Sequence, residues 1–71
     1  MTEYYIARDK DGLLWLFGSK PVKHETDGIF LLNRNENGEW PEEYELKKEM
    51  FTEVTFENSP QKVELKLVKE E

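Results

Sequence analysis

Three neighbouring side chains in the first half of the chain are candidates for acid–base chemistry. His24, Glu25 and Asp27 form the one cluster that places a titratable base beside carboxylates. General acid–base catalysis needs such groups within hydrogen-bond reach of a substrate, with suitably shifted pKa values. Covalent catalysis also needs an activated nucleophile, and nothing in the sequence orients the nearby hydroxyls of Ser19 and Thr26. We interpret the cluster as a polar loop.

The sequence contains the beginning of a calcium-binding loop but not its remainder. Asp9, Asp11 and Gly12 match the first positions of that motif. The motif also requires flanking helices and a bidentate glutamate near its end, where this chain has Lys20. The chain has no cysteine and a single histidine, so thiolate and histidine metal sites are excluded. We therefore expect a turn here, and no metal or cofactor.

Four glutamates close together in the second half could act as paired carboxylates. Glu42, Glu43, Glu45 and Glu49 are the residue type that glycosidases use in pairs. A chain of 71 residues offers no room for the cleft that such chemistry needs. No glycine-rich phosphate loop is present. These glutamates are expected to form a solvated, negative face, and the protein is not expected to be an enzyme.

Charge is distributed unequally between the two halves of the chain. Residues 1–34 carry five acids and five bases, whereas residues 35–71 carry eleven glutamates and five lysines, so the net charge of −6 lies in the second half. This balance argues against direct binding of nucleic acid, which relies on clustered lysine and arginine. No apolar run approaches the length of a membrane span. The opening residues do not resemble a signal peptide, and we expect a cytoplasmic protein whose partner is a protein, with a basic surface where it meets the glutamates.

These side chains must be positioned by strands, because the chain alternates short β segments with turn residues. The predicted strands cover residues 2–8, 13–17, 29–34, 51–57 and 62–69, with a further short edge strand at 22–24. Turns are expected at Asp9–Gly12 and at Asn35–Gly38. The segment Leu13–Phe17 is apolar on both faces, which is typical of a central strand.

Residues 40–50 fit two patterns. Pro41, followed by Glu42 and Glu43, with lysines at the far end, favours a helix. Alternation of Tyr44 with Leu46 favours a strand. We expect a short helical turn within a single domain, residues 1–71, that is mostly β: a five-stranded antiparallel meander or small open barrel. The residues expected to face inward are Ile6, Trp15, Leu31, Val54, Phe56, Val63, Leu65 and Leu67.

Aromatic residues are the strongest functional signal. Two strands with two apolar faces need a cover, which is the sheet itself, the helical turn or another molecule. An exposed aromatic surface would mark a binding site, because large apolar patches are uncommon on soluble monomers and aromatic residues are enriched in binding hot spots. The candidate protein-binding residues are Tyr5, Trp15, Phe17, Trp40, Glu42, Glu43 and Glu45.

Two stretches resemble a known group of proteins. Residues 4–12, Tyr-Tyr-Ile-Ala-Arg-Asp-Lys-Asp-Gly, followed by Leu14-Trp15-Leu16 and Lys20-Pro21, are similar to the opening of short uncharacterised proteins of gut bacteria and their phages or mobile elements. Residues 51–60 resemble their closing segment. The resemblance implies an accessory protein of a mobile element and transfers no functional residue.

The sequence thus favours a small non-enzymatic module that binds another protein. One alternative is a self-associating structural subunit, since a second apolar face also suits a symmetric homodimer. Another is an acidic mimic of nucleic acid that occupies a basic groove on a host protein.

Overall fold

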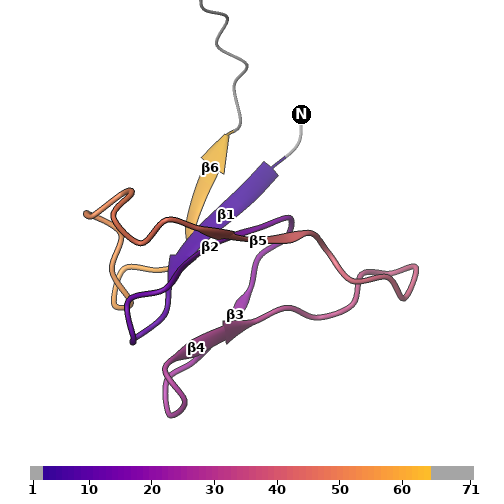
Figure 1. The fold of residues 1–71 in the computed structure, drawn as a ribbon. Coiled ribbons are helices and arrows are strands. Elements are labelled where there is room, and N and C mark those ends of the chain that lie inside the picture. The colour runs from indigo at the N-terminus through magenta and orange to yellow at the C-terminus, as the bar shows by residue number, and fades with distance from the viewer. Residues whose placement is uncertain (1–2, 65–71) are drawn as a thin grey trace, which may run out of the picture.

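The protein is an all-β domain of six strands, described by a computed structural model over residues 3–64. The strands are β1 (Glu3–Arg8), β2 (Leu14–Phe17), β3 (Val22–His24), β4 (Ile29–Leu31), β5 (Glu43–Leu46) and β6 (Gln61–Glu64). Four of them form an antiparallel sheet in the order β5-β2-β1-β6, and β3 pairs with β4 in a separate hairpin (Figure 1). Both sheets are open. The predicted antiparallel β class is confirmed, and β3 matches the edge strand expected at residues 22–24, but the sheets form neither a meander nor a barrel.

The β1–β2 hairpin forms the centre of the larger sheet. Its turn closes with a hydrogen bond from the backbone amide of Gly12 to the carbonyl of Asp9, 2.9 Å long, and Gly12 has a φ of 99° that favours glycine. The Asp11 carboxylate accepts a hydrogen bond from the backbone amide of Leu13. The predicted turn is therefore confirmed, and β2 lies between β1 and β5, as its two apolar faces predicted.

The β3–β4 hairpin is anchored to the first turn rather than paired with the sheet. The backbone amide of Lys10 donates a hydrogen bond to the carbonyl of Gly28 over 2.8 Å. Gly28 has a φ of 69°, and a Cβ atom there would lie 2.7 Å from the Cβ of Lys10. Only glycine fits this approach without displacement. The contact fixes the hairpin against one side of the larger sheet (Figure 1).

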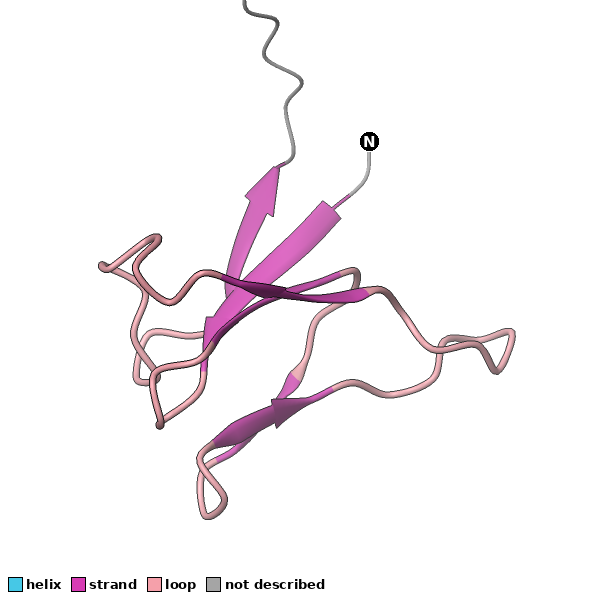
Figure 2. Cartoon of the chain, in the orientation of Figure 1, coloured by secondary structure: helices cyan, strands magenta, loops and turns pink. Residues whose placement is uncertain are grey.

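The predicted helical turn in residues 40–50 is wrong, because this segment contains the edge strand β5. Tyr44 pairs with Leu16, and Leu46 pairs with Leu14. A helix this short gains little from its own hydrogen bonds, whereas the exposed edge of β2 offers a ready ladder of partners. Within residues 3–64 the chain has no helix (Figure 2).

Residues 51–57 were predicted to be a strand and are instead a series of turns. Phe51 has a φ of 49°, which is incompatible with a strand. The Arg8 guanidinium donates hydrogen bonds to five backbone carbonyls, those of Gly12, Lys48, Met50, Phe51 and Val54. Carbonyls bound to a side chain are not free to join a sheet, so Arg8 replaces the ladder that this segment would otherwise need.

The larger sheet carries a small core on each face. On one face Ile6, Leu14 and Val54 are buried. On the other, Ala7, Phe17 and Phe30 are buried and partly exposed aromatic side chains pack around them.

Of the residues predicted to face inward, Ile6 and Val54 are confirmed as buried, and Trp15, Phe56 and Val63 are half-buried. Leu31 was predicted to face inward, but it is 47% exposed because it lies in a two-stranded hairpin with no layer beyond it. Leu65 and Leu67 lie outside the described residues.

Candidate functional site

The two faces of the larger sheet are covered to different extents. Tyr5, Ala7, Trp15 and Phe17 share the face against which Phe30 packs; we call this the covered face. The other we call the open face. Its apolar and aromatic residues are Tyr4, Ile6, Leu14, Leu16, Tyr44, Leu46 and Val63, and Arg8 and Gln61 lie on the same side.

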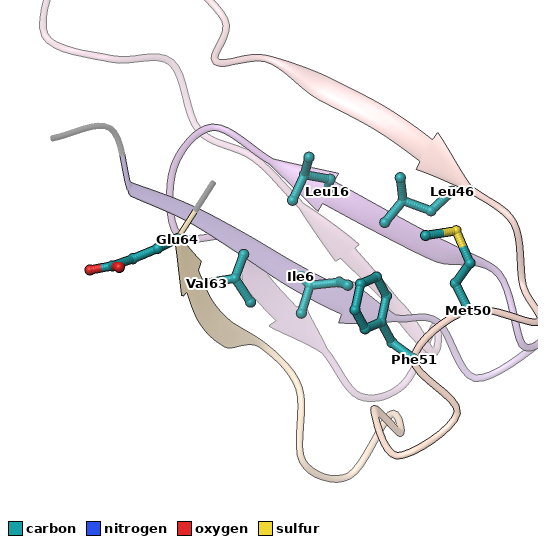
Figure 3. A pocket seen from close by; sticks show the side chains of 7 residues that line it. All are labelled: Ile6, Leu16, Leu46, Met50, Phe51, Val63 and Glu64. Carbon is teal, nitrogen blue, oxygen red and sulfur yellow. The ribbon is translucent and has the colours of Figure 1, made fainter. Parts of the chain in front are cut away.

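An apolar groove of about 500 Å³ lies on the open face. Figure 3 shows side chains from β1, β2, β5 and β6 converging on it, together with Met50 and Phe51 from the loop that follows β5. Met50 is 41% and Phe51 47% exposed, so the loop forms a lip on the groove and does not close it. The Glu64 side chain points away from the apolar group (Figure 3). The groove can therefore accept apolar side chains from another molecule.

Phe51 is held in a strained conformation at this lip. A bulky residue with a φ of 49° is a genuine outlier that costs about 1–2 kcal/mol. The Arg8 guanidinium binds the carbonyls of Met50 and Phe51 at 2.9 and 3.1 Å and so maintains this backbone. The strained residue carries an aromatic ring that is 47% exposed, and stored strain of this kind is concentrated at functional sites.

A carboxylate with two tyrosines lies farther along the same face. The hydroxyls of Tyr4 and Tyr44 both donate to Oε2 of Glu42, at 3.3 and 2.9 Å. Desolvation and the negative charge of Glu42 raise the pKa of Tyr4, and the hydrogen bond from its hydroxyl to that carboxylate raises the pKa of Tyr44. Both phenols therefore remain protonated donors, and they fix the position of the carboxylate.

A second, more polar depression adjoins this group. It has a volume of about 320 Å³ and is lined by Tyr4, Glu42, Trp40 and Pro41, among other residues. Trp40 is 62% exposed, and the Arg34 guanidinium lies 5.2 Å from the centroid of its ring. The indole face is thus accessible to a guanidinium group, and the chain's own arginine already occupies one such position.

The predicted binding residues divide between the two faces. Glu42 lies on the open face, whereas Glu43 and Glu45 are exposed on the opposite side of β5, where they pair with Phe17 and Trp15. Trp40 lies between the two sides, since it lines one depression with Glu42 and another with Glu43. The expectation that Glu42, Glu43, Glu45 and Glu49 form a single negative face is therefore wrong, because side chains alternate along a strand and Glu42 lies on the other side from Glu43 and Glu45.

The other predicted aromatic residues belong mainly to the core. Phe17 is 1% exposed, so it packs inside the molecule and offers no surface. Tyr5 and Trp15 are half-buried beside it. The groove residues Leu46, Met50 and Phe51 were not predicted as a site. The alternation of Tyr44 with Leu46 was the signal that could have placed Leu46 on this face.

The acid–base and metal candidates do not assemble into a site. Glu25 and Asp27 are exposed in the β3–β4 turn, and within the described residues no hydrogen bond joins their side chains to His24. Across residues 3–64 no three metal-ligating side chains come together. Asp9 is buried, and its Oδ2 accepts a hydrogen bond from the Trp15 indole at 3.0 Å. Burial is the main cause that raises the pKa of Asp9.

Comparison with known proteins assigns the chain to no family. No family model, curated protein or solved structure matches this chain. The resemblance to short proteins of gut bacteria and mobile elements therefore stays a prediction. Within residues 3–64, no helix is long and apolar enough to cross a membrane.

Proposed function

We propose that this chain is a small, non-enzymatic interaction module that binds another protein through the open face of its four-stranded sheet. The observation that carries the proposal is the asymmetry of the two faces. One is covered by the β3–β4 hairpin, whereas the other presents a groove of about 500 Å³. Met50 and Phe51 line this groove, Tyr44 lies on the same face, and all three are between 41% and 50% exposed. Large apolar side chains that stay exposed side by side mark candidate binding sites.

The charge of the chain supports a partner other than a second copy. Residues 35–64, which supply most of the rim of the groove, carry nine glutamates and three lysines. Two such surfaces repel each other, and like-charge juxtaposition across an interface is costly. A partner with basic groups around an apolar segment would be attracted instead. The prediction of a basic partner rests on this complementarity.

Site-specific photocrosslinking tests the proposal. A photoreactive phenylalanine analogue replaces Tyr44 on the open face. In a matched control it replaces Val22, which is 43% exposed but lies on the β3–β4 hairpin. In extract of the source cells we expect one discrete heterologous product from position 44 and none from position 22.

Other crosslinking results would contradict the proposal. A product with the mass of a dimer would favour the structural subunit instead. Equal crosslinking from both positions, or none from position 44, would refute binding through the open face.

A further inference from the structure

The group formed by Glu42, Tyr4 and Tyr44 has the chemistry of a receptor for one cationic side chain. Both tyrosines donate to the same oxygen, Oε2. The other oxygen, Oε1, accepts no hydrogen bond from any described residue. A carboxylate held by two donors is positioned in advance, and a charge-assisted bond to it loses less entropy than one to a free glutamate.

The surroundings suit arginine or lysine better than a neutral group. The adjoining depression of about 320 Å³ is bounded by the rings of Tyr4 and Trp40 and by Pro41. Aromatic faces attract a cation that lies over them. The approach of Arg34 to Trp40, 5.2 Å from guanidinium carbon to ring centroid, is an example within this chain.

The distance between this group and the groove limits the ligand. Glu42 and Leu46 lie on one side of the same extended segment, four residues apart, which corresponds to about 13 Å at the rise of a strand. An extended peptide spans the same distance with four residues, and its first and fifth side chains point the same way. An apolar side chain in the groove therefore places the fifth side chain at Glu42.

We infer that the open face binds an extended segment of a protein partner, in which an apolar side chain enters the groove and an arginine or lysine four residues away binds the carboxylate of Glu42. This inference rests on the proposed function and adds the chemistry that the partner must present. The charge of this chain argues against a second copy as the occupant, because residues 35–64 offer only three lysines against nine glutamates.

The test uses a synthetic peptide of defined sequence. The probe is acetyl-Leu-Ser-Leu-Ser-Arg-amide, and its control replaces arginine by citrulline, which has nearly the same shape but no charge. Each is titrated into the ¹⁵N-labelled full chain while amide shifts are recorded. We expect shifts at Tyr4, Tyr44 and Leu46, and binding of the citrulline peptide that is about 2–5 times weaker, the usual effect of an exposed charge pair.

Two glutamine variants locate the effect. Glu42→Gln keeps an acceptor oxygen for the tyrosines but removes the charge, and we expect it to bind both peptides equally. Glu43→Gln makes the same change in net charge on the opposite side of β5, beside Phe17, and should retain the preference for arginine.

The outcomes separate the two proposals. If both peptides shift the groove residues with equal affinity, the cation site is refuted while binding at the open face stands. An equal loss of preference in Glu42→Gln and Glu43→Gln would mean general charge attraction and would also refute the site. If neither peptide shifts the open face at millimolar concentration, the inferred peptide ligand is refuted, and the crosslinking experiment alone decides whether the open face binds a protein.

Discussion

The guanidinium of Arg8 organises the loop beside the groove, and its removal should be the most costly change of a single charged residue. It donates to five backbone carbonyls between Gly12 and Val54, at 2.6 to 3.1 Å. Each of the five N–H groups of the guanidinium therefore has a backbone acceptor. Arg8→Met keeps most of the apolar stem of the side chain and removes only the donors.

The expected loss follows from how exposed each bond is. The bonds to Val54 and Gly12 are partly buried, and we assign them about 1–1.5 kcal/mol each. The bonds to Lys48, Met50 and Phe51 are exposed. Their carbonyls can return to water, so the three together contribute about 1 kcal/mol. The sum is about 3–4 kcal/mol, against a total unfolding free energy of about 4–11 kcal/mol for a chain of 71 residues.

Urea unfolding followed by tryptophan fluorescence and circular dichroism measures this loss. Arg34→Met is the matched control, because Arg34 makes one surface contact with Trp40 and should cost less than about 1 kcal/mol. Arg8→Lys should recover only part of the loss, since an ammonium cannot reach five carbonyls in a planar fork. If Arg8→Met unfolds at the same urea concentration as Arg34→Met, the loop is held by something other than the guanidinium.

Three further changes test other parts of the structure. Gly28→Ala should destabilise the domain by about 1–2 kcal/mol from its left-handed backbone alone, and by more through the 2.7 Å approach to Lys10, as a lowered melting temperature would show. Burial raises the pKa of Asp9 above 3.8, so the folded chain binds more protons than the unfolded chain just above that pH, and the contribution of Asp9 to the unfolding free energy falls as pH rises. Asp9→Asn keeps an acceptor for the Trp15 indole, and its stability relative to the parent should therefore increase from acidic to neutral pH; a difference that does not change with pH would contradict this. Phe51→Gly should raise the unfolding free energy by relieving a φ of 49°, by up to about 1 kcal/mol, while it weakens binding of the probe peptide.

Much of the fold could be predicted because its signals are local. The Asp9–Gly12 and Asn35–Gly38 turns follow from glycine at positive φ, with φ of 99° at Gly12 and 79° at Gly38. The two apolar faces of Leu13–Phe17 predicted a central strand, and β2 is central. Each inference depends on residues close together in the sequence, where conformational preference and side-chain alternation are informative.

The wrong predictions concern segments whose local structure depends on residues far away in the sequence. Residues 51–57 alternate like a strand, but Arg8 binds the carbonyls of Phe51 and Val54 from more than forty positions away. Likewise, the helical signals around Pro41 and Glu42 are outweighed by the free edge of β2. Long-range contacts of this kind leave no trace in local periodicity.

The candidate site was less predictable than the fold, for a related reason. Sequence reasoning selected aromatic residues as a class and could not say which face of the sheet would remain open. Phe17 is buried in the core because Phe30 packs against its face of the sheet. Glu43 and Glu42 point to opposite faces because side chains alternate along β5 and the residue before it. The groove lip could not be foreseen, since it depends on the unusual backbone of Phe51.

One face of the sheet stays open because this short chain has few residues outside the sheet to cover it. A sheet of four strands has two faces, and the β3–β4 hairpin supplies Phe30 to only one of them. On the other face the residues after β5 could have collapsed over Leu16, but Arg8 binds their backbone and leaves only Val54 buried against Ile6 and Leu14. Met50 and Phe51 are thereby held at the edge of the groove, at the cost of strain in Phe51. The proposed binding of a partner in the groove offers a reason for this strain, because strained residues are concentrated at functional sites and glycine at position 51 would relieve it.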